Sequence, residues 1–294
     1  MALELRVHGL AGPLCSLSAN RAWDLRDLKR AVEHATGIPH YQQLLLRESS
    51  ELRTRAPLDA FAEAASADVT LVRVSLPPEK TAWLEKVTAD GLCLREAPAA
   101  LRADREVVLT AVEGDGRALQ YAPPELRAER DVVLASVRRS GIALKHAPAE
   151  FRADREVVLA AVRRRPAALA HASAELRAER EVVMAAVGGH GDALEYAAKE
   201  LQEDREVVLT AVRQSGHALR FAAAGLQTDS EIFGVARAEW KEIVGKDGLQ
   251  LRSAPAPVRA CREVVIAAVR QCGWVLRHVQ PDLRADREVV RAAV

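Results

Sequence analysis

Apolar and polar residues follow one repeated pattern from about residue 79 to the end of the chain. The six residues Ala103–Val108 (Ala-Asp-Arg-Glu-Val-Val) recur unchanged at Ala153–Val158 and Ala285–Val290. Near-copies begin at Ala128, Ala178, Glu203, Thr228 and Ala260, so successive copies start 25 residues apart, with a single spacing of 32. A fixed period between about 20 and 50 residues is typical of a linear array of repeats.

Each copy predicts a helix with a marked start. Asp104 is suited to cap the N-terminus, and Glu106 lies in the first turn, where the helix dipole favours an anion. Val107–Val112 is apolar apart from Thr110, so this helix needs cover on more than one side, which stacked copies supply. A glycine is predicted to end the helix of most copies as its C-cap: Gly116, Gly141, Gly191, Gly216, Gly248 and Gly273.

A shorter apolar segment follows each long helix. Ala118–Ala122 leads into Pro123-Pro124, and proline fits the first turn of a helix but disrupts its interior. We therefore expect one short helix of about two turns. Whole and partial copies together predict about nine repeats, so residues 77–294 are expected to form an all-α solenoid with one long and one short helix per repeat.

Two irregularities modify this pattern. The spacing of 32 adds seven residues, which is two helical turns, so Asp229–Val244 is predicted to be one longer helix with the same facing. In the last copy Arg291 takes the place of an apolar residue such as Leu109. It suits either a solvent-facing terminal repeat or a chain that stops within a repeat.

Residues 1–76 follow a different pattern. Leu3–Val7 and Leu14–Leu17 alternate as the two strands of a hairpin. Trp23–Ala35 has apolar residues near helical spacing, and Gly37 is predicted to end that helix. Further strands are predicted at Leu44–Leu46 and Val69–Val74. This order predicts an α+β domain over residues 1–76, joined to the solenoid of residues 77–294.

The first 75 residues resemble ubiquitin. The resemblance is carried by Leu28-Lys29, Gly37-Ile38-Pro39, Gln42-Gln43-Leu44-Leu45-Leu46, Pro57-Leu58-Asp59 and Val69-Thr70-Leu71-Val72. It implies a β-grasp fold and a recognition patch in which Leu46 and Val72 match apolar positions and Thr70 takes the place of a histidine. Leu44 and Ser50 stand at basic positions of the family, so most of the basic rim is lost. The segment Ser75-Leu76-Pro77-Pro78 replaces the Gly-Gly of conjugating members, so conjugation is not expected.

The 25-residue unit resembles a tandem helical repeat known only as a domain of unknown function. The match rests on segments such as Asp154–Val162 (Asp-Arg-Glu-Val-Val-Leu-Ala-Ala-Val). It implies a fold and a binding role, without an activity.

Two columns of residues recur at the repeat spacing. The first, here called the arginine row, is suited either to bind phosphate or to form ion pairs between neighbouring repeats, and we favour the ion pairs. Its members are Arg105, Arg130, Arg155, Arg180, Arg205, Arg262 and Arg287. The second, here called the ring row, lies on the short segment: Tyr121, His146, His171, Tyr196, Phe221, Ser253 and His278.

The ring row has three interpretations. It could be a structural seam of amphipathic rings, which we favour, a surface that grips an extended peptide, or a platform that stacks bases. A metal site at His146 and His171 is disfavoured because no carboxylate or cysteine stands at ligand spacing. Trp274 follows a helix-ending glycine, so it is either an exposed binding anchor or core packed against the longer helix.

Composition and short motifs limit the classes of partner and activity that the chain is expected to have. The chain has 42 Lys and Arg against 41 Asp and Glu, a net charge of +1, and this balance disfavours nucleic acid. The chain contains no run of about 18 apolar residues, so no membrane span is predicted. The four cysteines lack C-x-x-C spacing, which suggests reduced thiols in a cytoplasmic or nuclear protein. No nucleophile elbow, phosphate loop or H-E-x-x-H motif is present, so neither catalysis nor a cofactor is expected.

The function that these patterns favour is a non-enzymatic protein-interaction adaptor. The solenoid would hold a protein partner, and the patch of Leu46, Thr70 and Val72 would dock to ubiquitin receptors or proteasome-type proteins. The alternative is a structural or assembly scaffold subunit in which the ubiquitin-like domain only caps the repeats.

Overall fold

The computed structural model describes residues 3–20, 23, 25–47, 50–52 and 66–294. The chain divides into two compact units, Met1–Glu85 and Lys86–Val294, and the division falls inside helix α2 (Pro78–Ala89). The Pro57-Leu58-Asp59 segment used in the ubiquitin resemblance lies outside the described residues.

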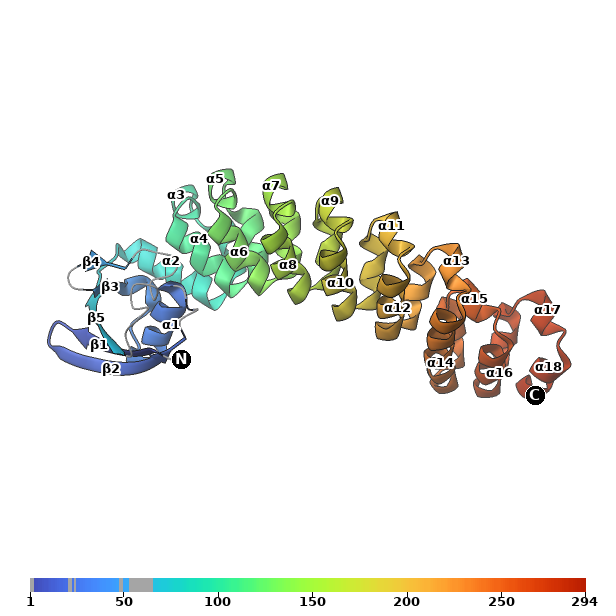
Figure 1. Ribbon diagram of the computed structural model, residues 1–294. Coiled ribbons are helices and arrows are strands. Elements are labelled where there is room, and N and C mark those ends of the chain that lie inside the picture. Colours follow the sequence, from blue (N-terminus) through green and yellow to red (C-terminus); the bar gives the residue numbers. More distant parts are fainter. Residues whose placement is uncertain (1–2, 21–22, 24, 48–49, 53–65) are drawn as a thin grey trace. The chain divides into compact units, whose positions relative to one another are not determined.

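The N-terminal unit is a mixed sheet with one helix against it (Figure 1). Its strands are β1 (Leu3–Gly9), β2 (Gly12–Ala19), β3 (Gln43–Arg47), β4 (Ser50–Glu51) and β5 (Ser66–Arg73), and its helices are α1 (Leu25–Thr36) and the 3₁₀-helix η1 (His40–Gln42). The strand order is β2-β1-β5-β3-β4, with β1 and β5 parallel and the other neighbours antiparallel. The predicted α+β plan is confirmed, and the order is consistent with a β-grasp.

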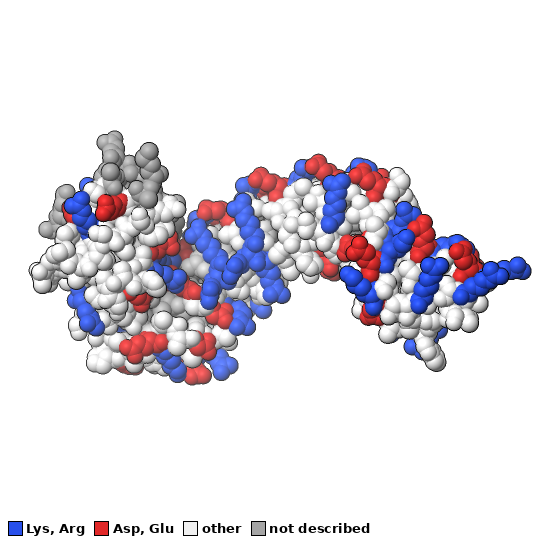
Figure 2. Space-filling model, turned by 90° about the horizontal axis from the view of Figure 1, so that it is seen from below, with Lys and Arg blue, Asp and Glu red and all other residues white. Residues whose placement is uncertain are grey.

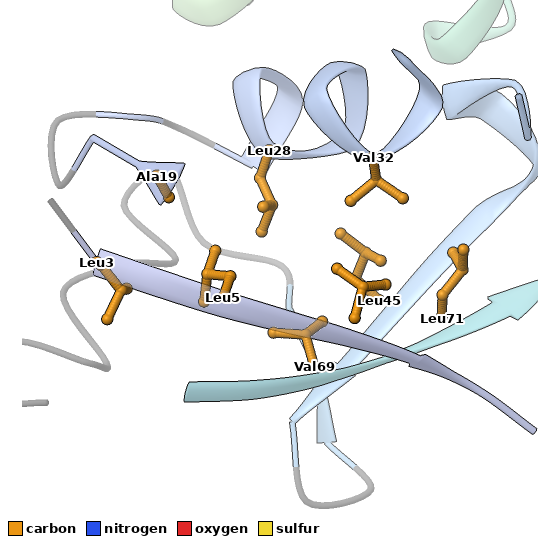
Figure 3. Packing of buried hydrophobic residues seen from close by; sticks show 9 residues of the cluster. Leu3, Leu5, Ala19, Leu28, Val32, Leu45, Val69 and Leu71 are labelled. Atoms are coloured by element: carbon orange, nitrogen blue, oxygen red, sulfur yellow. The ribbon is translucent and has the colours of Figure 1, made fainter. Parts of the chain in front are cut away.

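The core of this unit follows from the alternation in β1. Leu3 and Leu5 are fully buried, whereas Glu4 between them is exposed. Helix α1 covers the same face with Leu28 and Val32, which are four residues apart and therefore on one side of the helix. Figure 3 shows these two side chains pointing from the helix towards the strands. The sheet therefore has one buried face and one outer face.

Gly37 ends α1 as predicted. Its φ of +72° lies in the left-handed region that glycine adopts without strain. Its N–H donates to the Glu33 carbonyl at 2.8 Å, which satisfies one of the free carbonyls at the end of the helix.

The second unit is the predicted array of stacked helices (Figure 1). After α2, its long helices are α4 (Arg105–Gly114), α6 (Arg130–Arg139), α8 (Arg155–Arg164), α10 (Arg180–Gly189), α12 (Arg205–Gln214), α14 (Ser230–Lys246), α16 (Arg262–Gln271) and α18 (Arg287–Ala293). Long helices that follow one another pack side by side, α4 on α6 and α6 on α8. Val107 and Val108 are both fully buried, as expected for a helix covered on more than one side.

Two short elements, rather than the one predicted, separate the long helices. The first is a 3₁₀-helix: η3 (Gly91–Glu96), η4 (Gly116–Tyr121), η5 (Gly141–His146), η6 (Pro166–His171), η7 (Gly191–Tyr196), η8 (Gly216–Phe221), η9 (Gly248–Ser253) and η10 (Gly273–His278). The second is a single α-turn: α3 (Ala99–Arg102), α5 (Pro124–Arg127), α7 (Ala149–Arg152), α9 (Ala174–Arg177), α11 (Lys199–Gln202), α13 (Ala224–Gln227), α15 (Ala256–Arg259) and α17 (Pro281–Arg284).

The extended backbone between these two elements explains the split. Ala122 has φ −70° and ψ 146°, as a residue before proline favours. Ala172 adopts φ −68° and ψ 158° although serine follows it, so the break belongs to the repeat and does not depend on proline.

The recurring glycines do not end the long helices, which corrects the prediction. Gly116 begins η4, and among the described residues only Gly12 and Gly37 are glycines with positive φ. A Cβ on Gly116 would lie 2.2 Å from the Ser136 carbonyl oxygen in the next repeat, and one on Gly141 would lie 2.3 Å from the Ala161 oxygen. At these two positions glycine is present because the backbone of the next repeat approaches too closely for a side chain.

The longer helix is confirmed. α14 runs unbroken over 17 residues, with Asp229 as its N-cap. Its buried residues are Ile232, Ala236, Trp240 and Val244, spaced four apart along one face. The seven-residue insertion therefore lengthens the helix while keeping its packing face.

Candidate binding surfaces

The residues predicted for the ubiquitin-like patch lie together on the outer face of the N-terminal sheet. Leu46 on β3 is directly opposite Thr70 on β5, and Leu44 is opposite Val72. Leu45 and Leu71, which alternate with them, are buried on the core side. The patch residues are themselves partly exposed. We define the outer face as Leu44, Leu46, Thr70 and Val72.

The structure adds neighbours to the outer face that the sequence reasoning missed. His8 on β1 pairs with Thr70 across the parallel strands, and its Nε2 lies 2.9 Å from Asp68 Oδ1. Leu10, in the turn after β1, is 86% exposed, and Leu14 on β2 is 49% exposed. A leucine between Gly9 and Gly12 in a hairpin turn is too far from the core to be buried. This position could have identified Leu10 from the sequence as an exposed apolar residue.

The ring row lies at the C-terminal ends of the 3₁₀-helices. Neighbouring 3₁₀-helices pack against one another from η3 to η8, so residues 25 apart lie in adjacent layers. Its first five members are partly buried: Tyr121, His146, His171, Tyr196 and Phe221. Ser253 and His278 are exposed, so the partly buried stretch does not extend into η9 and η10.

Basic neighbours surround the two adjacent histidines of the ring row. Burial, and then the charge of Lys145, lower the pKa of both His146 and His171. Arg127 lowers the pKa of His146 further. Both rings are therefore neutral near pH 7 and present hydrogen-bonding nitrogen atoms without added charge. Among the described residues no group of three or more His, Cys, Asp or Glu could hold a metal ion.

Arginine also contacts the ring row near its end. The Arg220 guanidinium lies 5.2 Å from the centroid of the Phe221 ring, a cation–π distance. Arg277 donates from Nε to His278 Nε2 at 2.9 Å.

The arginine row forms ion pairs between neighbouring repeats, which confirms the interpretation we favoured. Each of six arginines contacts two carboxylates of the following repeat: Arg105 with Glu129 and Asp131, Arg130 with Asp154 and Glu156, Arg155 with Glu179 and Glu181, Arg180 with Asp204 and Glu206, Arg205 with Asp229 and Glu231, and Arg262 with Asp286 and Glu288. The hydrogen bond from Arg262, together with the Val289 N–H, lowers the pKa of Asp286 to about 2.

The two large rings near the C-terminal end are placed differently. Trp240 is fully buried in α14, with its ring 4.4 Å from that of His217. Trp274, at the second position of η10, is 78% exposed, so it is not part of the core. Leu249 takes the same position in η9 and is 49% exposed.

The cysteines are free and partly buried, at positions 15, 93, 261 and 272. Burial raises the pKa of the Cys15 thiol. None of the described helices combines the length and the apolar character that crossing a bilayer requires.

Comparison with known proteins identifies the repeats. A family model described as a domain of unknown function, DUF4116, matches residues 83–127, 129–177, 179–227 and 261–294, more than half of the chain. The matched segments leave out residues 228–260, which contain α14. A comparison with curated proteins finds no match.

A solved structure with limited similarity is the crystal structure of ATBAG1 in complex with HSP70. It is 19% identical over 46% of this chain and 87% of that chain, with a TM-score of 0.24, which is too low to support an argument about fold. The family match has a direct structural counterpart, because each of the two longest matched segments covers two of the stacked units described above. The chain therefore belongs to the DUF4116 family of repeat-containing proteins.

Proposed function

We propose that the protein is a non-enzymatic adaptor. In this proposal the outer face of the N-terminal sheet docks to a ubiquitin receptor or a proteasome-type protein, and the repeat array holds a second protein partner. The observation that carries the proposal is the outer face itself, where Leu44, Leu46 and Val72 gather on the side of the sheet away from the core. A cluster of partly exposed apolar side chains is typical of a protein-binding surface.

The ring row supports the second part of the proposal. Partly buried tyrosine, histidine and phenylalanine residues in adjacent layers offer apolar surface with polar edges, which suits an extended peptide. Many acidic residues of the array are accounted for by helix caps and ion pairs, which is why we propose binding rather than catalysis.

Direct binding to purified ubiquitin-receptor domains tests the docking role. We expect Leu46→Glu with Val72→Glu to abolish binding of the full chain, since a charge within an apolar contact is left unpaired. The matched control is Ser16→Glu with Ser66→Glu. Both serines are exposed on the same sheet and flank Arg6, away from Val72. Equal binding by the two double variants would refute docking through the outer face.

The alternative is a structural scaffold in which the ubiquitin-like domain only caps the repeats. NMR relaxation of the full chain separates the two functions. A cap tumbles together with the array, whereas independent tumbling of residues 3–73 would eliminate the scaffold.

A further inference from the structure

Five arginines crowd the ends of two neighbouring long helices. They are the last two residues of α6, the last two of α8 and the residue that follows α8, and we call them the basic cluster: Arg138, Arg139, Arg163, Arg164 and Arg165. All five are exposed. Because α6 packs against α8 and Arg163 repeats the position of Arg138, the two sets lie side by side. Figure 2 shows basic side chains gathered over this part of the array, whereas both charges mix farther along.

The cluster is held in place from within the array. Arg139 donates from Nε to the Gly114 carbonyl at 2.9 Å, and Arg164 donates from Nε to the Arg139 carbonyl at 3.4 Å. Each bond links one repeat to the preceding one. The bonds restrict two guanidinium groups, and within the described residues the terminal nitrogen atoms of both groups donate to no protein atom. Restricting a side chain before binding reduces the entropy that binding must offset.

Among the described residues, the basic cluster lacks the carboxylate contacts that hold the arginine row. In the part of the chain that the structure describes, Arg138, Arg163 and Arg165 form no salt bridge, whereas six members of the arginine row contact two carboxylates each. A nearby carboxylate, Asp115, is held by Arg117 at 2.7 Å. That hydrogen bond, with a contribution from the charge of Arg139, lowers the pKa of Asp115.

Helix capping does not account for this many cations. The dipole at a helix C-terminus favours a positive charge. However, α12 and α16 each have only one arginine in the last turn, Arg213 and Arg270. Additional unpaired cations in adjacent turns repel one another. The excess is therefore better explained by an anionic partner.

The borders of the cluster favour a protein over a nucleic acid. On one side α4 ends in Glu113-Gly114, and on the other α10 ends in Gly188-Gly189. The cluster is thus two helices wide, and packed helices lie about 8–10 Å apart. A nucleic acid strand following this edge would leave the cations after two repeats and reach Glu113 and Asp115, whereas a short acidic segment would not.

We propose that the basic cluster docks an acidic segment of a partner protein whose carboxylates form two groups about 10 Å apart. One group meets the end of α6 and the other the end of α8. This inference does not rest on the adaptor proposal, because it involves neither the outer face nor the ring row.

The test measures binding of the full chain to a labelled peptide, Gly-Glu-Glu-Ala-Glu-Glu-Gly. In an extended peptide its two glutamate pairs lie about 10 Å apart. The glutamine counterpart and a single-stranded oligonucleotide are measured alongside. The test variant is Arg138→Gln with Arg163→Gln. The control, Arg213→Gln with Arg270→Gln, changes the same helix position in two repeats outside the cluster. Of these two residues Arg213 also pairs with Glu231 at 3.3 Å, an exposed contact of small energy.

We expect the glutamate peptide to bind more tightly than the glutamine peptide and to weaken as salt is raised. The test variant should lower its affinity roughly fivefold to tenfold, since exposed charge pairs contribute modestly. The control should stay within about twofold of the parent, with both variants melting at the parent temperature. Equal losses in the two variants, or no preference for the glutamate peptide, would overturn the proposal. Tighter binding of the oligonucleotide through the same arginines would replace it with a nucleic-acid site.

Discussion

The N-terminal sheet and the repeat array bury their apolar residues in different ways. In the sheet, Leu5, Leu28 and Leu45 come from segments far apart in the sequence and close around one core. In the array, α8 packs between α6 and α10 and buries Val158 and Val162, and α12 buries Val208 and Val212 at the same positions. A single closed core depends on all its members, whereas a stack is held by contacts between neighbours. The difference predicts how far a local change spreads.

Truncation of one buried leucine in each region has the largest expected effect. Leu5 and Leu144 are both fully buried, and replacing either with alanine should reduce the free energy of unfolding by about 2–5 kcal/mol. Hydrogen exchange measured by mass spectrometry should show Leu5→Ala weakening protection throughout the sheet and leaving the array unchanged. Leu144→Ala should weaken the layers around η5, with an effect that fades along the stack. Loss of protection in both regions from either variant would contradict the comparison.

The close approach between repeats predicts the next largest effect. A Cβ on Gly141 would meet the Ala161 carbonyl oxygen at 2.3 Å, so Gly141→Ala should destabilise the array by about 1–3 kcal/mol as the backbones separate. Gly188 has open space around its Cβ position and lies inside a helix, so Gly188→Ala should stabilise it by about 0.5–1 kcal/mol. Thermal unfolding of both variants measures the contrast. A stable Gly141→Ala variant would show that the stack accommodates wider layers.

Helix capping within the array predicts a smaller difference between two repeats. Asp154 accepts hydrogen bonds from the N–H groups of Glu156 and Val157, whereas Glu179 stands at the same position of α10 without a side-chain cap. Both carboxylates pair with an arginine of the preceding repeat, so the two alanine variants lose the same type of ion pair. Asp154→Ala should cost about 1 kcal/mol more than Glu179→Ala in denaturant unfolding. Equal losses would assign the effect to the ion pairs alone.

The smallest expected effect is the loss of stability when acid protonates a carboxylate paired with the arginine row. The pKa of Asp286 is about 2, below its ordinary value of 3.8, so its ionised form stabilises the fold above about pH 4, and this contribution is lost as the pH falls towards 2. Arg262→Gln should therefore lower the melting temperature at pH 6 more than at pH 2. The control Arg287→Gln changes the member of the arginine row that lies in α18. Within residues 1–294 no repeat follows α18, so none supplies Arg287 with a carboxylate. The same pH dependence in both variants would refute pairing as the cause.

The candidate surfaces could be predicted only in part. The resemblance to ubiquitin was sufficient to group Leu46, Thr70 and Val72, and the alternation that buries Leu45 and Leu71 places all three on the opposite side of the sheet. The exposure of Trp274 could not be predicted, because it depends on which residues the last repeats bring against η10. The basic cluster could likewise be recognised only in the tertiary structure, because Arg138 and Arg163 are adjacent only after α6 packs on α8.

The sequence by itself determined the repeat period, the long helices and the two-region plan, because apolar spacing and caps such as Asp104 act within one turn of chain. The tertiary structure decided why glycine recurs at Gly116 and which carboxylates each arginine contacts. It also decided that each repeat has two short elements rather than one. The glycines and the ion pairs depend on how closely one repeat approaches the next, a distance between backbones that no local pattern encodes.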